Sequence, residues 1–262
     1  MTPGATIKMG CRICGGIDST KSHLIPAAMA RDALKGDKHL VSGSRFVDGM
    51  TKTQSGLWDD DILCLSHEKM LGDADSAAIN FCRRVQEQTL IIKPDVFTVG
   101  GVDVDQIVKF VAAVLWRCSV SQRFGMHEFN LGAAAEKKLA AILFHGTPVG
   151  DFPLVSINAV CSDIPDVEGV INYPKLLHAK GARLVRFMAA GMIFTAEIGW
   201  KKLPLLARMR INGQTQIVTG FVPFEKTIEF LSALPVVESM GRKRSGGPMR
   251  QRKPKKVSDP AD

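Results

Sequence analysis

The sequence has no apolar run of the length that crosses a lipid bilayer, which is about 20 residues. The nearest stretch, Ile107 to Trp116, is interrupted by Lys109. Residues 1–9 also lack the apolar core of a secretory signal peptide. We therefore expect a cytoplasmic protein with no membrane partner.

Cysteines are few, six in 262 residues, and their spacing does not indicate a disulfide framework. Cys82, Cys118 and Cys161 each stand alone in apolar surroundings, where a cysteine usually packs as a small core residue. The other three lie in short motifs with metal-ligand spacing. The sequence therefore predicts core thiols together with a metal site.

Acidic residues are absent from Gly241 to Lys256, although the formal net charge of the chain is +8. Residues 241–262 carry eight positive and two negative charges, so the remaining 240 residues are close to +2. The cations are Arg242, Lys243, Arg244, Arg250, Arg252, Lys253, Lys255 and Lys256. The segment has too little apolar content to offset ordering entropy, so we predict a disordered tail that neutralises nucleic-acid phosphates. A solubilising tail, or contact with another acidic surface, is the alternative.

Two short motifs predict a structural zinc site. Cys11 and Cys14 are two residues apart and precede two glycines, which is typical of a zinc knuckle, and Cys64-x-x-His67 adds a third thiolate and an imidazole. The long insertion between the motifs fits a treble clef, in which a hairpin and loop separate the knuckle from a helix. In the alternative interpretation Cys11 and Cys14 are incidental and Cys64 is a core residue.

Apolar periodicity predicts an α+β protein in three parts: a zinc module in residues 1–75, an α+β domain in residues 76–240 and the tail in residues 241–262. The domain should have a helical middle, followed by an antiparallel β region. Expected helices start at Pro26 and His67 and span 77–90, 104–118 with Asp103 as cap, 133–144 and 224–234. Expected strands are 22–25, 58–63, 154–160, 184–188, 192–198, 205–211 and 216–222, with a loop or a loose hairpin at 36–56 and an Asn212-Gly213 hairpin turn.

The N-terminal motifs resemble those of HNH endonucleases that carry a structural zinc. The similarity covers about residues 11–72 and depends on Cys11, Cys14, His23, Ile25, Pro26, Leu63, Cys64 and Lys69. It implies a ββα-metal fold and metal-dependent hydrolysis of nucleic-acid phosphodiester bonds, with DNA preferred over RNA as the partner.

The resemblance also implies a catalytic site. His23 takes the place of the general base, Asp60 and Asp61 lie near the family's middle Asn, and Glu68 stands where its final His lies. The carboxylates would hold Mg²⁺ or Mn²⁺. This chain has Ser22 where the family often has an Asp cation ligand, and His67 where a Cys is usual.

Each of these residues has a plain structural alternative. His23 can orient the zinc loop, residues 59–61 can form a solvated acidic turn, and Glu68 can be an acid in the first turn of a helix. The alternative functions are a non-catalytic zinc module for nucleic-acid or protein binding, and an interaction protein that acts through residues 100–235.

Overall fold

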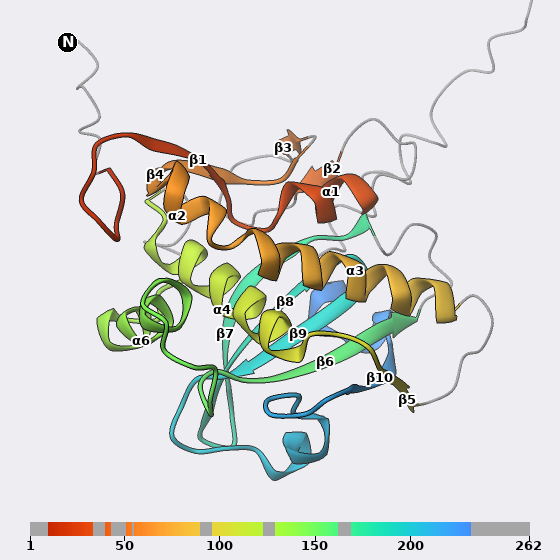
Figure 1. The fold of residues 1–262 in the computed structure, drawn as a ribbon. Helices are drawn as coiled ribbons and strands as arrows, with labels where there is room; N and C mark the ends of the chain where they lie inside the picture. Colours follow the sequence, from red (N-terminus) through yellow and green to blue (C-terminus); the bar gives the residue numbers. More distant parts are fainter. Residues whose placement is uncertain are drawn as a thin grey trace, which may run out of the picture.

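The computed structural model describes residues 10–33, 40–42, 51–53, 55–89, 96–122, 129–161 and 169–231. These residues form a six-stranded sheet, helices packed over one of its faces, and a small N-terminal region that lies across the helices (Figure 1). The predicted mixture of helices and sheet is confirmed. The predicted basic tail and most of the predicted loop at 36–56 lie outside the described residues.

The N-terminal region is built on a pair of antiparallel strands, β1 (Ser19–His23) and β4 (Trp58–Cys64). Thr20 pairs with Leu63 but Ser22 pairs with Asp59, so the ladder is irregular between them and β4 has extra residues there. Helix α1 (Ala27–Ala33) begins directly after Pro26, and α2 (Leu65–Lys69) directly after β4. Within the segment predicted as a loop or a loose hairpin, β2 (Leu40–Ser42) and β3 (Thr51–Thr53) form an antiparallel two-stranded sheet, which agrees with the hairpin.

Helix α4 (Val104–Val120) is the centre of the core. It packs against α3 (Gly72–Thr89), α6 (Ala133–Phe144) and the sheet, and nearly all of its residues are buried, as expected for a helix that is apolar on all sides. The Asp103 side chain accepts a hydrogen bond from the Gln106 backbone N–H at 3.1 Å, which confirms the predicted cap. Phe110 of α4 packs against Phe187 and Phe194 of the sheet.

The sheet has the strand order β5–β10–β6–β9–β8–β7. The strands are β5 (Val96–Val99), β6 (Leu154–Cys161), β7 (Asn172–Ala179), β8 (Ala182–Ala189), β9 (Met192–Glu197) and β10 (Ile217–Pro223). Strand β10 is antiparallel to β5 but parallel to β6, so the sheet is mixed and not the predicted antiparallel one. After β9 a long connection brings the chain back to the edge of β6 that β9 does not occupy. Strand β10 therefore runs in the same direction as β6.

The predicted strands need correction in four places. Residues 205–211, predicted as a strand, form the 3₁₀ helix η2 (Pro204–Met209), in which Leu205 is 86% exposed. The Asn212-Gly213 turn therefore does not join two strands, and the Asn212 side chain instead accepts from the Val155 N–H at 2.7 Å. Strands β5 and β7 were not predicted. Pro174 within β7 is tolerated because β7 is an edge strand.

The C-terminal end of the described chain covers the sheet face opposite α4. After η3 (Phe224–Lys226), residues 228–231 are helical, and the rest of the helix predicted at 224–234 lies outside the described residues. Phe224 packs with Met188 and Ile193 in a small second cluster. None of the helices in the described ranges has the length and apolar character needed to span a bilayer.

Candidate metal centre

The four predicted zinc ligands lie together. Cys11 and Cys14 come from the turn before β1, Cys64 ends β4 and His67 lies in α2, and their ligand atoms are all within 4.8 Å of one another. A tetrahedral zinc ion requires Sγ–Sγ distances of about 3.7 Å and Sγ–N distances of about 3.5 Å. The Cys14–Cys64 Sγ distance is 3.9 Å, and the His67 Nδ1 lies 3.6 Å from the Cys11 Sγ and 3.1 Å from the Cys64 Sγ. This Cys3His group could hold a zinc ion, as predicted.

The backbone around Cys11 and Cys14 explains why the turn forms. The Cys11 N–H donates to the Gly16 carbonyl at 2.7 Å, and the Gly15 N–H donates to the Cys11 carbonyl at 2.8 Å. Gly10 has a φ of +73°, and a Cβ there would lie 2.5 Å from the Gly16 oxygen, so a side chain at this position would clash. The sequence thus selects a tight turn that aims both thiols at one point.

The Cys64 thiol is prepared to act as a metal ligand. Hydrogen bonds from the Ser66 hydroxyl, whose oxygen lies 3.0 Å from the Cys64 Sγ, and from the His67 backbone N–H lower its pKa to about 5. The thiolate is the form that binds zinc, so Cys64 offers it at neutral pH. The ring of His67 is also oriented, because it packs edge-on against Phe144 of α6 with a centroid distance of 5.6 Å.

His23 ends strand β1, opposite Trp58, and it is half-buried. Its Nε2 atom is buried and has no hydrogen-bond partner among the described residues. Burial, and then the nearby charges of Lys21, Arg117 and Arg31, lower the pKa of the imidazole to about 4. The ring is therefore neutral at pH 7, and one of its polar atoms has no hydrogen-bond partner in the described ranges.

Residues 59–61 do not act as one acidic turn. Asp59 is buried, and its Oδ2 accepts from the Ser121 hydroxyl at 2.7 Å and from the Gln122 N–H at 3.1 Å, at the C-terminal end of α4. The Asp61 Oδ1 accepts from the Gly10 N–H at 2.7 Å, beside the knuckle. Asp60 accepts a hydrogen bond from the Ser19 hydroxyl through its backbone carbonyl. Asp59 is thus a structural anchor, whereas Asp60 and Asp61 lie in the irregular part of the ladder.

Glu68 is held by a buried cation. Its Oε2 accepts from the Ser22 hydroxyl at 2.6 Å, and its Oε1 accepts from the Arg117 Nη2 at 3.0 Å. Arg117 is buried in α4 and also pairs with Asp75 of α3 at 3.2 Å. The sequence signal for Arg117 is a charged residue among the apolar residues at the end of helix α4.

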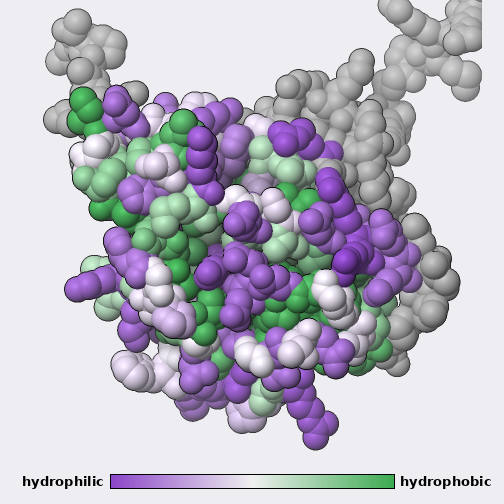
Figure 2. All heavy atoms as spheres, viewed as in Figure 1, coloured by the Kyte–Doolittle hydropathy of each residue, from purple (hydrophilic) through white to green (hydrophobic). Residues whose placement is uncertain are grey.

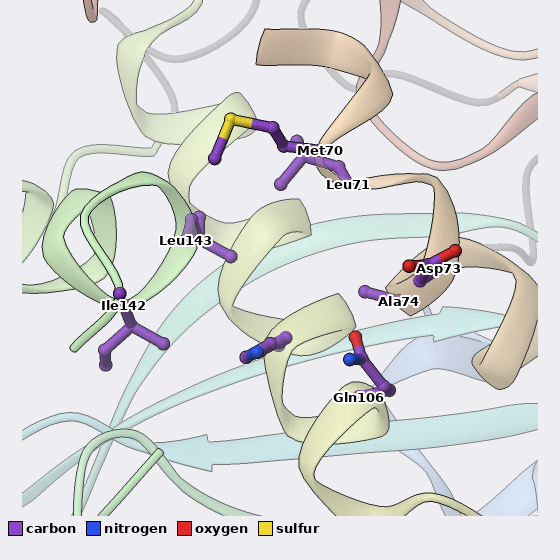
Figure 3. Close-up of a pocket in the computed structure, with 9 residues that line it drawn as sticks. Met70, Leu71, Asp73, Ala74, Gln106, Ile142 and Leu143 are labelled. Carbon is purple, nitrogen blue, oxygen red and sulfur yellow. The ribbon is translucent and has the colours of Figure 1, made fainter. Parts of the chain in front are cut away.

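A cleft of about 310 Å³ lies between the α2–α3 connection, α4 and α6. Its wall includes Met70, Leu71, Asp73, Ala74, Gln106, Ile142 and Leu143 (Figure 3). No predicted catalytic or zinc-binding residue lines it. In the described ranges, the Cys3His group is the one set of three or more His, Cys, Asp or Glu side chains close enough to bind a metal ion, so His23, Asp60, Asp61 and Glu68 form no comparable set.

The lowered pKa of His23 predicts a pH dependence of stability. An unfolded histidine titrates near 6.5 and the folded one near 4, so the unfolded chain binds more protons between these values and stability falls as the pH drops through this window. We expect the wild type to lose more stability than His23→Gln between pH 7 and pH 5 in urea titrations, with a constant difference above pH 7.5. The His23→Gln variant keeps the zinc ligands, so it controls for stability lost through their protonation. Equal losses of stability in the two proteins between pH 7 and pH 5 would contradict the lowered pKa of His23.

Comparison with known proteins finds no match for this chain among protein families, curated proteins or solved structures. The resemblance to HNH endonucleases therefore depends on the motif residues alone, and what the structure adds to them is a Cys3His group that could bind zinc.

Proposed function

We propose that this chain is a non-catalytic zinc protein that binds nucleic acid, with its N-terminal region arranged as a treble clef. The order of elements supports this arrangement: a Cys-x-x-Cys turn, the paired strands β1 and β4, and helix α2 with the fourth ligand. The net charge of +8 supports a polyanionic partner, and DNA is the partner to test first. Most of this charge lies in the predicted cationic tail, where eight positive and two negative residues leave six net positive charges that would contact the phosphates.

The non-catalytic assignment depends on the contacts of Glu68. Both of its carboxylate oxygens already have partners, Ser22 and Arg117. Moving Glu68 to a divalent cation would leave the buried Arg117 with Asp75 alone, and breaking a buried ion pair costs about 3–5 kcal/mol. Since Ser22 offers no carboxylate either, the catalytic cation would depend on Asp60 and Asp61.

The second candidate is an HNH-like endonuclease, and His23 favours it. A neutral imidazole whose Nε2 has no partner among the residues that the structure describes can take the proton from an attacking water. The ring lies next to a ladder irregularity, which is a common feature beside active sites, and Asp60 and Asp61 lie in that irregularity. When bound, Mg²⁺ or Mn²⁺ would offset the charge that develops on the phosphate.

Nicking of supercoiled plasmid separates the two candidates. The wild type, His23→Ala and the control His178→Ala, an exposed residue of β7, are incubated with Mg²⁺ or Mn²⁺. We expect no nicking above the buffer rate by any of them, and equal affinity of all three for labelled DNA. Nicking by the wild type and His178→Ala that falls at least about 100-fold in His23→Ala would establish the endonuclease and overturn our proposal. Absence of DNA binding at low salt would contradict both and favour a protein-interaction role.

A further inference from the structure

The loop after β9 presents a tryptophan to solvent. Trp200 is 96% exposed, whereas Trp116 is buried and Trp58 is partly buried. The chain is poor in aromatic residues, with three tryptophans and one tyrosine. A solvent-exposed indole ring is a candidate contact for a binding partner, because tryptophan is enriched in surfaces that become buried when two molecules bind.

Cations from three separate elements lie on or beside the loop that carries this ring. Lys201 and Lys202 follow it in the chain, and the Lys138 Nζ of α6 lies 5.5 Å from the Trp200 ring centroid. The turn between β7 and β8 is also close, because a Cβ on Gly181 would lie 3.2 Å from the Lys201 Nζ. The Trp200 patch, as we define it, consists of Lys138, Lys180, Arg183, Trp200, Lys201 and Lys202.

The backbone fixes the two loops of the patch against each other. The Ile198 N–H donates to the Arg183 carbonyl at 3.0 Å, and a Cβ on Gly199 would lie 3.2 Å from the Arg183 Cβ. The patch lies at the end of the sheet that faces down in Figure 1, where Figure 2 shows a mainly hydrophilic edge.

The positive charge of the patch is not neutralised in the part of the chain that the structure describes. None of its five cations forms an ion pair there. Glu197, the acid nearest to Trp200 in the chain, is buried and binds the Arg210 Nε at 2.6 Å, so it does not face the lysines. A surface with five uncompensated cations around an exposed aromatic ring is complementary to a polyanion that also has flat apolar faces.

We propose that the Trp200 patch binds single-stranded DNA, with one base stacked on the indole and the neighbouring phosphates on the lysines. Indole and ammonium groups contact base faces and phosphates and do not require a ribose 2′-hydroxyl. A duplex hides its base faces, so the single strand is the better fit. A membrane surface fits less well, because interfacial binding needs a broad apolar face, whereas the large apolar side chains exposed on this loop are Trp200 and Leu205.

The inference takes its class of partner from the proposed function but uses a surface that includes none of the zinc ligands. Leu154 pairs with Glu197, so β6 begins at the end of the sheet where Trp200 lies. Strand β10 runs parallel to β6, and Lys226 after it therefore lies at the opposite end. Lys226→Glu is thus a matched control for charge reversals in the patch.

The test measures binding of the full-length protein to a fluorescein-labelled 20-mer of oligo(dT) by anisotropy, at several salt concentrations. We expect Trp200→Ala to weaken binding about 10-fold or more, since one stacked base is lost, and Trp200→Phe to restore most of the affinity. The double variant Lys201→Glu/Lys202→Glu should bind more weakly with a shallower salt dependence, and Lys226→Glu should resemble the wild type. Circular dichroism verifies that the Trp200 variants are folded.

Unchanged affinity of Trp200→Ala for oligo(dT), or a duplex bound more tightly than the single strand, would overturn the inference. Binding of oligo(U) more than about 10-fold tighter than oligo(dT) would overturn the choice of DNA. Displacement of oligo(dT) by phosphatidylserine vesicles, but not by unlabelled oligonucleotide, would assign the patch to membranes. If the wild type binds plasmid but Trp200→Ala binds oligo(dT) equally well, the inference alone fails; if the wild type binds neither nucleic acid, the proposed function fails as well.

Discussion

Replacement of Arg117 by methionine should lower the free energy of unfolding by about 3–5 kcal/mol, the usual cost of removing one partner from a buried ion pair. The Arg117 side chain is 1% exposed and lies 3.0 Å from Glu68 and 3.2 Å from Asp75. Methionine fills much of the space, but it leaves two carboxylates facing an apolar site. Urea titration at pH 7.5 with zinc present measures the change.

Two further variants separate the charge effect from lost packing. The triple variant Arg117→Met/Glu68→Gln/Asp75→Asn removes the stranded charges, and it should recover more than about 1 kcal/mol relative to Arg117→Met. Arg84→Met is the matched control, because this arginine of α3 is exposed and donates to the Gly100 and Gly101 carbonyls. We expect a loss of about 1 kcal/mol or less there. A loss of that size in Arg117→Met would show that the ion pairs contribute little.

The elements that the sequence predicted correctly have strong local signals. Helix α4 shows an apolar stripe behind an Asp103 cap, and α6 is an alanine-rich run that ends before Gly146. The 205–211 segment was mistaken for a strand because apolar and polar residues alternate from Ala207 to Ile211, yet Leu205 is 86% exposed and Ile211 is the member of the segment that joins the core. The parallel pairing of β10 with β6 has no local signature, since it depends on where the connection after β9 returns.

The same distinction applies to the site. The Cys3His group follows from ligand chemistry at fixed short spacings, so its four members were found from the sequence. The contacts of Glu68 were not, because Ser22 and Arg117 lie 46 and 49 residues away and belong to elements without a shared pattern. Asp59 likewise meets Ser121 across 62 residues. Such long-range contacts determine whether a carboxylate can bind a metal cation or instead stabilises the fold.

Loss of the zinc ligands should unfold the N-terminal region while the sheet remains folded. Cys64→Ser removes a thiolate at the centre of the cluster, and metal binding in such modules is coupled to their folding. We expect one zinc per chain in the wild type and less than about 0.1 in the variant by elemental analysis. Limited proteolysis should then cut the variant between residues 10 and 70. The region 96–231 should stay protected, because α4 packs on the six-stranded sheet through side chains such as Phe110, Phe187 and Phe194, although the N-terminal residues join the same apolar core.

Cys161→Ser is the control for this experiment. Cys161 ends β6, is only partly buried and lies outside the cluster, so this variant should retain one zinc and the wild-type cleavage pattern. A strong chelator should convert the wild type to the pattern of Cys64→Ser, and added zinc should reverse it, because the ligands are presented by a chain that refolds around the ion. A chelated protein that is metal-free and still resists cleavage between residues 10 and 70 would refute a structural zinc. The N-terminal region would then be held by its contacts with α4, chiefly those of Arg117 with Glu68 and of Ser121 with Asp59.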